Sequence, residues 1–243
     1  MTVTIDLQGR RVLVTGAAGA IGTAVTATLA DAGAEVVGFD TRPGPGVVTC
    51  DVTDERSLVG AVQTAAAEGP LTDVVHCAGM VSVGTIGHTP LAEISRVLEV
   101  NLLSCFLLLK ALPPVLPPGA TITLLSSQAA VHGAPGWAAY GAAKAGVLRV
   151  VEAAAKELGP DIRVNAVCPG SVRSPMGDTA IARSAAAEGT TPAAVARRYE
   201  QDNPLGRMAL VEEIAAVCLF LVSPLASYVN GTGLFVDGGD RPG

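Results

Sequence analysis

A glycine-rich turn near the start of the chain constrains the fold more than any other feature of this sequence. The apolar, β-branched segment 11–15 is followed by Gly16, Gly19 and Gly22, and then by segment 23–33, which is typical of a helix. Glycines let the backbone turn tightly and approach a ligand, and the amino end of a helix attracts a phosphate group. Turns are often rich in glycine, so the cluster alone is weak evidence. Between a strand and a helix, however, it predicts the start of a dinucleotide-binding fold.

The rest of the chain continues this alternation of short apolar runs and helical stretches. The runs that predict strands are 11–15, 35–39, 46–49, 73–77, 120–126, 161–167 and 233–236. The stretches that predict helices are 20–33, 54–68, 91–112, 137–159 and 211–223. This order predicts an α/β fold, a doubly wound parallel sheet with helices on both faces, as a single domain over residues 1–243. The connections should be right-handed, and the binding site should lie at the carboxyl ends of the strands.

An acidic residue follows the second predicted strand. Asp40 comes directly after 35–39 and eighteen residues after Gly22. A carboxylate at this position can accept hydrogen bonds from both hydroxyls of an adenosine ribose, and it would repel a 2′-phosphate. Arg42 is the one basic residue close by in the sequence. The pattern therefore favours NAD over NADP as the cofactor.

A possible catalytic cluster lies further along the chain. Tyr140 and Lys144 are four residues apart, which places them on one face of a helix. A neighbouring ammonium favours the phenolate and lowers the tyrosine pKa from its usual value of about 10, toward the range useful for acid–base catalysis. Ser127 ends the apolar run that begins at residue 120, so a rigid strand would hold its hydroxyl where it can polarise a carbonyl. A lone Tyr-x-x-x-Lys is usually an ordinary helix step, but the glycine turn upstream favours the catalytic interpretation.

Together these motifs resemble the short-chain dehydrogenase/reductase family in its compact single-domain branch. The resemblance runs from Leu7 to Gly239, and the motifs occur in the family's order. They are Thr15-Gly-Ala-Ala-Gly-Ala-Ile-Gly22, Asp51-Val52, Cys77-Ala-Gly79, Asn101, Ser127, Tyr140-x-x-x-Lys144, Cys168-Pro-Gly170 and Val236-Asp-Gly-Gly239.

The resemblance implies a catalytic tetrad of Asn101, Ser127, Tyr140 and Lys144. Tyr140 would be the acid and base, and Ser127 would position the substrate oxygen. Lys144 would bind the nicotinamide ribose and lower the tyrosine pKa, while Asn101 would hold a proton-relay water. The implied activity is the NAD(H)-dependent interconversion of a secondary alcohol and a ketone by hydride transfer.

Two alternatives to this activity remain open. An NADPH-dependent reductase of carrier- or CoA-bound 3-oxoacyl groups would share every catalytic residue, although Asp40 argues against it. A non-catalytic nucleotide-binding protein could use the same fold, because fold alone does not determine function. The complete tetrad argues against that second alternative.

The resemblance also implies which residues contact the cofactor. Asp51 would contact the adenine, and the backbone of Val172 and the hydroxyl of Ser174 would hold the carboxamide. The expected cofactor residues are Gly16, Gly19, Ala20, Ile21, Gly22, Asp40, Asp51, Val52, Ala78, Gly79, Asn101, Tyr140, Lys144, Pro169, Gly170, Val172 and Ser174.

Three positions depart from the family's usual motifs. Ala20 occupies a position where glycine is usual, and the glycine at position 19 gives the spacing of the longer epimerase-type branch. His76 begins His-Cys-Ala-Gly where the family usually has Asn-Asn-Ala-Gly, so an amide that braces the central strand is missing. We expect a small local rearrangement there. Ser174 replaces a commoner threonine and keeps the hydroxyl.

The substrate is less constrained than the reaction. Segment 174–205 lies outside the regular alternation; the resemblance implies a lid over the substrate, and the alternative is a plain surface excursion. Gln128, His132 and Trp137 would flank the reacting carbon. His132 could bind a polar substituent or face water, and Trp137 could line the substrate pocket or serve packing only. A neutral or alicyclic alcohol or ketone is the expected substrate.

Composition bears on partners and location. The net charge of −6 argues against nucleic acid as a partner. Five scattered cysteines without a Cys-x-x-Cys pair indicate reduced thiols and a cytoplasmic location. The first residues do not resemble a signal peptide, and the three histidines show no metal-binding spacing. The most apolar stretches, Leu102–Leu112 and Ile214–Val222, are shorter than the roughly 20 residues that span a bilayer, so no membrane association is expected.

The family resemblance also implies a homotetramer. The long helices predicted at 91–112 and 137–159 would pack against their symmetry mates. The sequence around Leu102 and Phe106 is too apolar all round for a fully exposed helix, in agreement with such an interface.

Overall fold

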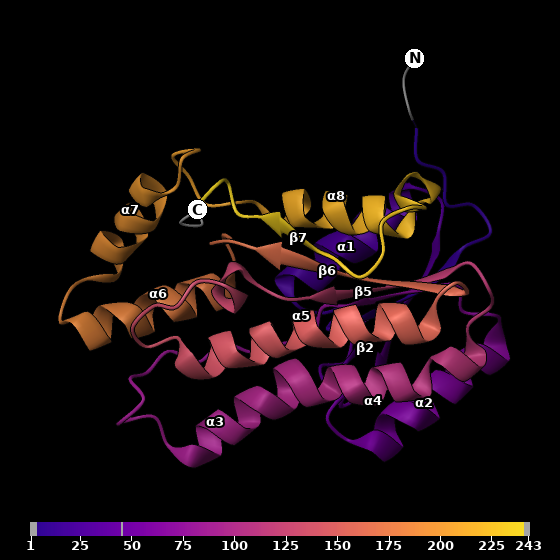
Figure 1. The fold of residues 1–243 in the computed structure, drawn as a ribbon, viewed down its shortest axis with the longest axis horizontal. Coiled ribbons are helices and arrows are strands. Elements are labelled where there is room, and N and C mark those ends of the chain that lie inside the picture. The colour runs from indigo at the N-terminus through magenta and orange to yellow at the C-terminus, as the bar shows by residue number, and fades with distance from the viewer. Residues whose placement is uncertain (1–3, 45, 241–243) are drawn as a thin grey trace.

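The computed structural model describes residues 4–44 and 46–240. Its centre is a seven-stranded sheet in the order β3-β2-β1-β4-β5-β6-β7, and every neighbouring pair is parallel (Figure 1). The strands are β1 (Arg11–Thr15), β2 (Glu35–Asp40), β3 (Val47–Thr49), β4 (Asp73–His76), β5 (Ala120–Leu125), β6 (Ile162–Pro169) and β7 (Gly233–Val236). The predicted doubly wound parallel sheet is confirmed. Its strand order reverses between β1 and β4, where such folds bind ligands.

Helices cover both faces of the sheet. They are α1 (Ala20–Asp31), α2 (Glu55–Glu68), α3 (Leu91–Leu98), α4 (Ser104–Ala111), α5 (Ala138–Leu158), α6 (Pro175–Glu188), α7 (Pro192–Asp202) and α8 (Val211–Val222). Four short helical turns join them: η1 (Glu99–Leu103), η2 (Pro113–Val115), η3 (Gln128–Ala130) and η4 (Pro224–Ala226). Helices α1 and α8 pack together on one face, and α2, α4 and α5 cover the other (Figure 1).

Side-chain alternation along the strands supplies both cores. In β1, Val12 and Val14 face the core under α1 and α8, while Leu13 faces the core under α2, α4 and α5. All three are fully buried, as expected for a parallel strand covered on both sides.

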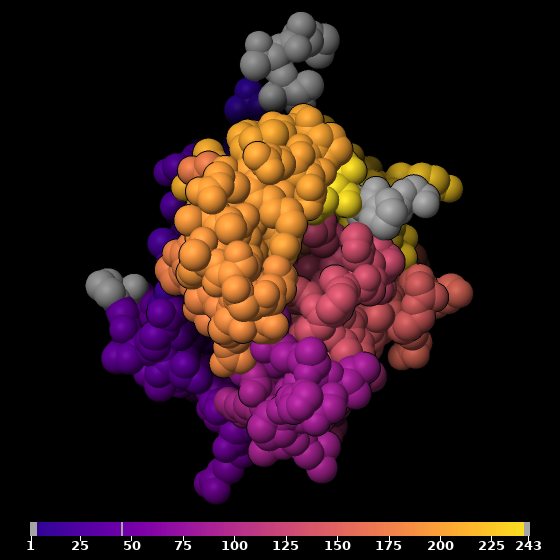
Figure 2. All heavy atoms as spheres, turned by 90° about the vertical axis from the view of Figure 1, so that its left-hand side faces the viewer, coloured from indigo at the N-terminus to yellow at the C-terminus, as the bar shows by residue number. Residues whose placement is uncertain are grey.

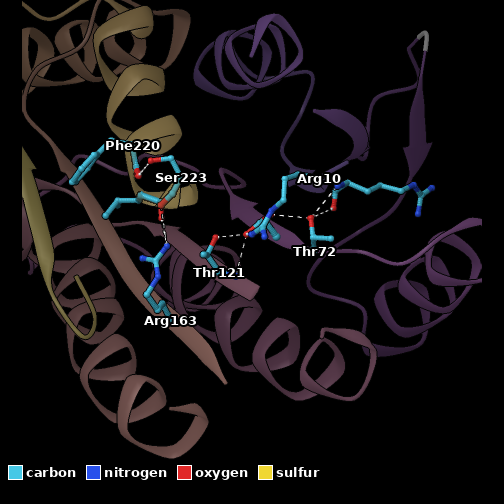
Figure 3. A network of polar contacts seen from close by, with 9 residues as sticks. Arg10, Thr72, Thr121, Arg163, Phe220 and Ser223 are labelled. Carbon is cyan, nitrogen blue, oxygen red and sulfur yellow. Dashed lines mark hydrogen bonds and ion pairs between the residues drawn. The ribbon is translucent and has the colours of Figure 1, made fainter. Parts of the chain in front are cut away.

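The amino ends of the strands are closed by a network of charged and polar side chains (Figure 3). The fully buried Asp73 of β4 accepts hydrogen bonds from Arg10 (2.7 Å from Nε), from the Thr72 hydroxyl (2.9 Å) and from the Thr121 hydroxyl (2.7 Å). The guanidinium of Arg163 donates to the carbonyl oxygen of Leu221 at the end of α8, at 2.8 Å. These hydrogen bonds fix the amino ends of β4, β5 and β6 to their neighbours.

The apolar stretch Leu102–Leu112 is part of a longer helical run than the sequence indicated. The helical run Leu91–Val115 has 25 residues, and an 18-residue window within it has a mean hydropathy of 1.5, so by length and composition alone it could span a bilayer. The run joins α3, η1, α4 and η2, which lengthens the stretch recognised in the sequence. Its Cys105, Leu108 and Leu112 belong to the core beneath the sheet, and it packs beside α2 and α5. One side of this run therefore belongs to the core, and the rest of it is not buried in the single chain.

The other differences concern helices. The predicted helix 91–112 is interrupted by η1, a π-helical turn that contains Asn101. Segment 174–205, where the alternation predicted no helix, forms α6 and α7. Ser174 and Thr191 each cap one of these helices through the side-chain oxygen, and each is followed by proline at the first helical position. This Ser/Thr-Pro pattern is a known helix start, and it is the signal in the sequence that could have predicted both helices.

Candidate active site

A cavity of about 1260 Å³ opens at the carboxyl ends of the strands. Figure 2 looks onto this end of the molecule, where α6 and α7, in orange, lie beside the rose-coloured segment near residue 130 and the magenta α3. Every residue proposed from sequence for catalysis, cofactor binding or substrate contact lines this cavity. We call it the site cavity.

The glycine turn has the geometry that its sequence predicts. Gly16 has φ of +67°, and a Cβ there would lie 2.7 Å from the backbone nitrogen of Ala78. A Cβ on Gly22 would collide with the carbonyl oxygen of Gly16. Gly19 precedes α1, and among the described residues no side chain caps that helix. Its first backbone N–H groups therefore remain available to an anion in the site cavity.

Asp40 is buried at the end of β2 and connects this strand to the glycine turn. Its carboxylate accepts hydrogen bonds from the backbone nitrogens of Ala18 (3.0 Å) and Arg42 (2.9 Å), and from Arg42 Nε (3.3 Å). Burial opposes the negative charge, but these hydrogen bonds and the Arg42 charge outweigh it and lower the pKa of Asp40. The carboxylate is thus ionised and held in place at the rim of the site cavity.

The structure brings Ser127, Tyr140 and Lys144 together. Lys144 is almost fully buried, its Nζ lies 5.7 Å from the centre of the Tyr140 ring, and it donates a hydrogen bond to the carbonyl oxygen of Leu125 at 2.8 Å. The hydroxyl of Ser126 binds the carbonyl oxygen of Lys144 at 2.8 Å, which ties α5 to the end of β5. The juxtaposition therefore rests on strand and helix backbone.

The expected direction of the Tyr140 pKa is wrong for the protein without cofactor. Burial raises the pKa of Tyr140 to about 12, and the hydrogen bond with Ser127 opposes this only in part. Burial also lowers the pKa of Lys144, to about 8. The sequence argument counted the attraction between ammonium and phenolate but not the loss of water around both groups. As the pH rises, Lys144 is therefore the first of the two to lose its proton.

Asn101 projects from the π-helical turn η1 into the same region. Its Nδ2 donates to the carbonyl oxygens of Met80 (2.9 Å) and Val97 (3.0 Å), and its Oδ1 accepts from the Met80 nitrogen (3.2 Å). The side chain thus braces the loop after β4. A Cβ on Gly79 would lie only 3.0 Å from the Asn101 Oδ1, which explains the glycine in this loop. The proton-relay role of Asn101 stays a prediction.

His76 provides the bracing that its sequence seemed to lack. Its Nδ1 lies 2.6 Å from the Thr15 hydroxyl oxygen, and its Nε2 lies 3.0 Å from the Ser104 hydroxyl oxygen. Burial, with a smaller effect from the Lys144 charge, lowers the pKa of His76 to about 3, so the imidazole is neutral. It joins β1, β4 and α4 through both ring nitrogens. The histidine, which is longer than the usual asparagine, therefore links the end of β4 to its neighbours.

The three substrate candidates occupy different parts of the site cavity wall. Trp137 makes an edge-to-face contact with Tyr140, with ring centres 5.7 Å apart and an interplanar angle of 71°. It therefore both packs against the tyrosine and lines the cavity. Gln128 donates from Nε2 to the Asp240 carboxylate at 3.0 Å. His132 lines the cavity and is half-buried.

Helices α6 and α7 form a hairpin over the cavity with a small core of its own. That core consists of Ile181, Ala185, Val195 and Met208. Glu188 at the end of α6 pairs with Arg198 of α7 through two hydrogen bonds of 2.7 Å. Arg183 binds Glu93 at 2.5 Å, which links α6 to α3. The segment is thus a folded unit with its own core, and it lines the site cavity.

Sequence reasoning missed several cavity-lining residues. They are Thr41, Met80, Arg96, Met176, Ile181, Glu188, Arg198, Tyr199, Asp202, Met208 and Asp240. Most come from α6, α7 and the last described turn, where no motif marks them. Among the described residues, no group of three potential metal ligands occurs.

Comparisons with known proteins agree with the fold. A family model described as enoyl-(acyl carrier protein) reductase matches residues 16–240. The chain is 37% identical over 199 residues to a trans-4-hydroxycyclohexanecarboxylate dehydrogenase from Sinomonas cyclohexanicum, covering 81% of this chain and 71% of that protein. It is 32% identical to a 3-oxoacyl-(acyl-carrier-protein) reductase from Thermotoga maritima, covering 96% of this chain and 98% of that protein.

Solved structures extend the likeness to three dimensions. A structure of NAD⁺-bound xylitol dehydrogenase superimposes with a TM-score of 0.91 at 28% identity, covering 96% of this chain and 99% of that one. The strand order, the arrangement of Ser127, Tyr140 and Lys144 around one cavity, and these matches along nearly the whole sequence lead to one assignment. The chain belongs to the short-chain dehydrogenase/reductase family of oxidoreductases.

Proposed function

We propose that the protein is an NAD(H)-dependent oxidoreductase that interconverts a secondary alcohol and a ketone. The observation that carries the proposal is a single cavity lined both by the glycine turn and by Ser127, Tyr140 and Lys144. A nucleotide held at the turn would extend toward the tyrosine, as expected for ligands bound along the carboxyl edge of an α/β sheet.

The residues fit a nicotinamide dinucleotide. The uncapped amino end of α1 offers N–H groups for the pyrophosphate, and the absence of a Cβ on Gly16 and Gly22 leaves the turn compact. Asp40 is ionised and faces the cavity rim, where it would bind ribose hydroxyls. The remaining cofactor residues expected from sequence also line the cavity. When bound, the nicotinamide supplies the acceptor or donor of hydride.

Each catalytic side chain then has a role in handling the proton and the substrate oxygen. Tyr140 takes the hydroxyl proton in oxidation and returns it in reduction. The Ser127 hydroxyl donates a hydrogen bond to the substrate oxygen. Lys144, with a pKa of about 8, is mostly an ammonium at neutral pH, and its charge favours the phenolate form of Tyr140. Asn101 holds the loop after β4 against the cavity.

The first alternative is an NADPH-dependent 3-oxoacyl reductase, as the similarity to the Thermotoga protein suggests. Arg42 is the side chain that would favour it, since its guanidinium lies near the glycine turn, 4.0 Å from a Cβ built on Gly19. Its Nε, however, is paired with Asp40. The second alternative, a non-catalytic nucleotide-binding protein, is disfavoured by the complete catalytic set.

Cofactor titration tests the proposal. NADH and NADPH are titrated against the wild type and Asp40→Ala, with Asp31→Ala in α1 as a control for loss of one carboxylate. The wild type should bind NADH more tightly, and Asp40→Ala should weaken NADH roughly ten- to a hundredfold through loss of charge-assisted hydrogen bonds. The preferred cofactor is then assayed with a panel of secondary alcohols. Preference for NADPH, or no oxidation of any alcohol, would overturn the proposal.

We also propose a cytoplasmic homotetramer. Leu103 and Phe106 of the helical run 91–115 are 49% and 53% exposed in the single chain, and they lie where a second copy could cover them. Among the described residues no disulfide joins the cysteines, in agreement with a reducing compartment. A particle of one chain mass, 24.4 kDa, in solution scattering would contradict the assembly.

A further inference from the structure

The charges around the outer part of the site cavity are unbalanced. Among the described residues that line the cavity on the side of the lid and the final turn, Glu188, Asp202 and Asp240 are acidic and Arg198 is basic. Arg198 is already paired with Glu188 through two hydrogen bonds of 2.7 Å. An incoming substrate therefore meets an excess of negative charge at this end.

Among the acidic residues in this part of the cavity, Asp240 is hydrogen-bonded to a residue beside the catalytic serine. It accepts a hydrogen bond of 3.0 Å from Nε2 of Gln128, the residue directly after Ser127. The NH2 group of the Gln128 amide therefore faces the Asp240 carboxylate. The remaining amide oxygen of Gln128 is buried without a hydrogen-bond partner in the described structure. The pair thus connects the catalytic strand end to the end of the described chain.

The turn that carries Asp240 is built rather than loose. Gly238 and Gly239 have φ of +65° and +85°, conformations that L side chains rarely adopt, and they turn the chain toward the cavity. The amide of Asn203, just after α7, donates to the carbonyl oxygen of Asp237 at 2.8 Å. Pro204 packs beside Gly239. The Asp240 carboxylate is therefore placed by contacts with both the lid and the catalytic loop.

We propose that Asp240, held by Gln128, is a specificity-determining residue that rejects substrates with an anionic group and accepts a hydrogen bond from a neutral hydroxylated one. The inference rests on the proposed alcohol–ketone activity and narrows its substrate class. A half-buried carboxylate repels a carboxylate or phosphate brought close to it, because little water is left to screen the charges. The same oxygen atoms accept a hydrogen bond from a substrate hydroxyl.

Binding measurements test this inference separately from turnover. Trp137 is the only tryptophan of the chain and lines the site cavity, so its fluorescence reports a ligand there. Cyclohexanol and cyclohexanecarboxylate are titrated into the NADH complex of the wild type and of Asp240→Asn, which keeps the shape of the side chain. Asp161→Asn, at an exposed residue before β6, is the control with the same change in net charge.

The wild type should bind cyclohexanol more tightly than the carboxylate. Asp240→Asn should strengthen binding of the carboxylate roughly tenfold, because one nearby like charge is removed. It should leave cyclohexanol within about twofold, because the asparagine oxygen still accepts a hydrogen bond. Asp161→Asn should change neither. An equal effect of Asp240→Asn on both ligands, no effect on either, or no fluorescence response to any ligand would overturn the inference.

Turnover distinguishes this failure from failure of the proposed function. trans-1,4-Cyclohexanediol and trans-4-hydroxycyclohexanecarboxylate differ at one ring substituent, and kcat/KM is measured for both. A wild type that oxidises the diol and the acid equally well, with no change of this ratio in Asp240→Asn, retains the proposed function and loses the inference. A wild type that oxidises no alcohol in the panel loses the proposed function, while the binding result still decides the role of Asp240.

Discussion

The two ends of the sheet treat buried polar groups in opposite ways. At the amino end, the Asp73 carboxylate accepts hydrogen bonds from Arg10, Thr72 and Thr121, so its partners all belong to the protein (Figure 3). At the carboxyl end, Tyr140 and Lys144 face a cavity, and burial moves the pKa of each away from its ordinary value. At the amino end of the sheet, the polar groups are hydrogen-bonded to one another and stabilise the fold. At the carboxyl end, they face the cavity, where they could act on a ligand.

This contrast teaches where substitutions should be felt. A change at the amino end should cost stability and leave the chemistry alone, because its groups contact only other parts of the fold. A change at the carboxyl end should lower the catalytic rate and change the free energy of unfolding little. His76 is an exception, because its side chain lies near the site but stabilises the fold. The following experiments test that division.

The largest expected effect is on catalysis at Tyr140. Tyr140→Phe removes the proton donor with almost no change in volume, so kcat for alcohol oxidation should fall by roughly a thousandfold or more, while NADH still binds. The melting temperature should stay close to that of the wild type. Tyr228→Phe, at an exposed tyrosine, is the matched control. Near-wild-type turnover of Tyr140→Phe would show that the chemistry lies elsewhere.

The second effect concerns stability at the amino end. Asp73→Ala removes the acceptor shared by Arg10 and two hydroxyls. Because the Arg10 side chain is 32% exposed and can be hydrated, we expect a loss of about 2–3 kcal/mol of unfolding free energy. Urea denaturation measures this change. The control is Asp161→Ala, at an exposed aspartate directly before β6. The kcat of the folded fraction should be unchanged. A variant with native stability and impaired catalysis would reverse the proposed division.

The third effect tests the exception at the carboxyl end. His76→Phe removes both hydrogen bonds of the imidazole, so we expect a loss of about 2 kcal/mol, or roughly 4–8 °C in melting temperature. His76→Asn keeps an amide able to bind one neighbour and should lose less. Calorimetry compares the two. If both variants melt together with the wild type, the imidazole contributes no bracing.

The smallest effect is a pH dependence that comes from Lys144. Its pKa in the folded protein, about 8, lies below the ordinary lysine value of 10.5, so above pH 8 the unfolded chain holds more protons than the folded one. Stability from this group therefore rises with pH between those values. The wild type should gain roughly 1 kcal/mol over Lys144→Met between pH 8 and 9, in the absence of cofactor. Parallel stability curves of the two proteins would show that Lys144 titrates normally.

Much of the fold could be predicted because strand burial and helix periodicity are local. Val12, Leu13 and Val14 show why: a parallel strand covered on both faces is apolar at every position. The glycine turn and the Tyr140–Lys144 spacing could be predicted for the same reason, since both are short motifs whose geometry is set within a few residues. The site residues identified in this way all line one cavity.

Other features depend on contacts between distant segments, and these could not be predicted. The pKa of Tyr140 depends on how much water the fold removes, which no neighbouring residue reveals. Asp240 reaches Gln128 across 112 positions of sequence. The π-helical turn at Asn101 leaves no distinct pattern in a helix that is apolar throughout. Helices α6 and α7, by contrast, each begin with a Ser/Thr-Pro capping pattern from which they could have been predicted.

The contact between Gly16 and Ala78 has a consequence for how this enzyme can change. A Cβ on Gly16 would lie 2.7 Å from the Ala78 nitrogen, so the loops after β1 and β4 pack backbone to backbone. Neither loop can shift without displacing the other. A substitution that moves the loop after β4 would therefore alter the shape of the glycine turn, although the substituted residue lies outside that turn. Variation at these two positions should be correlated among related sequences, and nucleotide affinity could be adjusted from the neighbouring strand while the glycines themselves stay fixed.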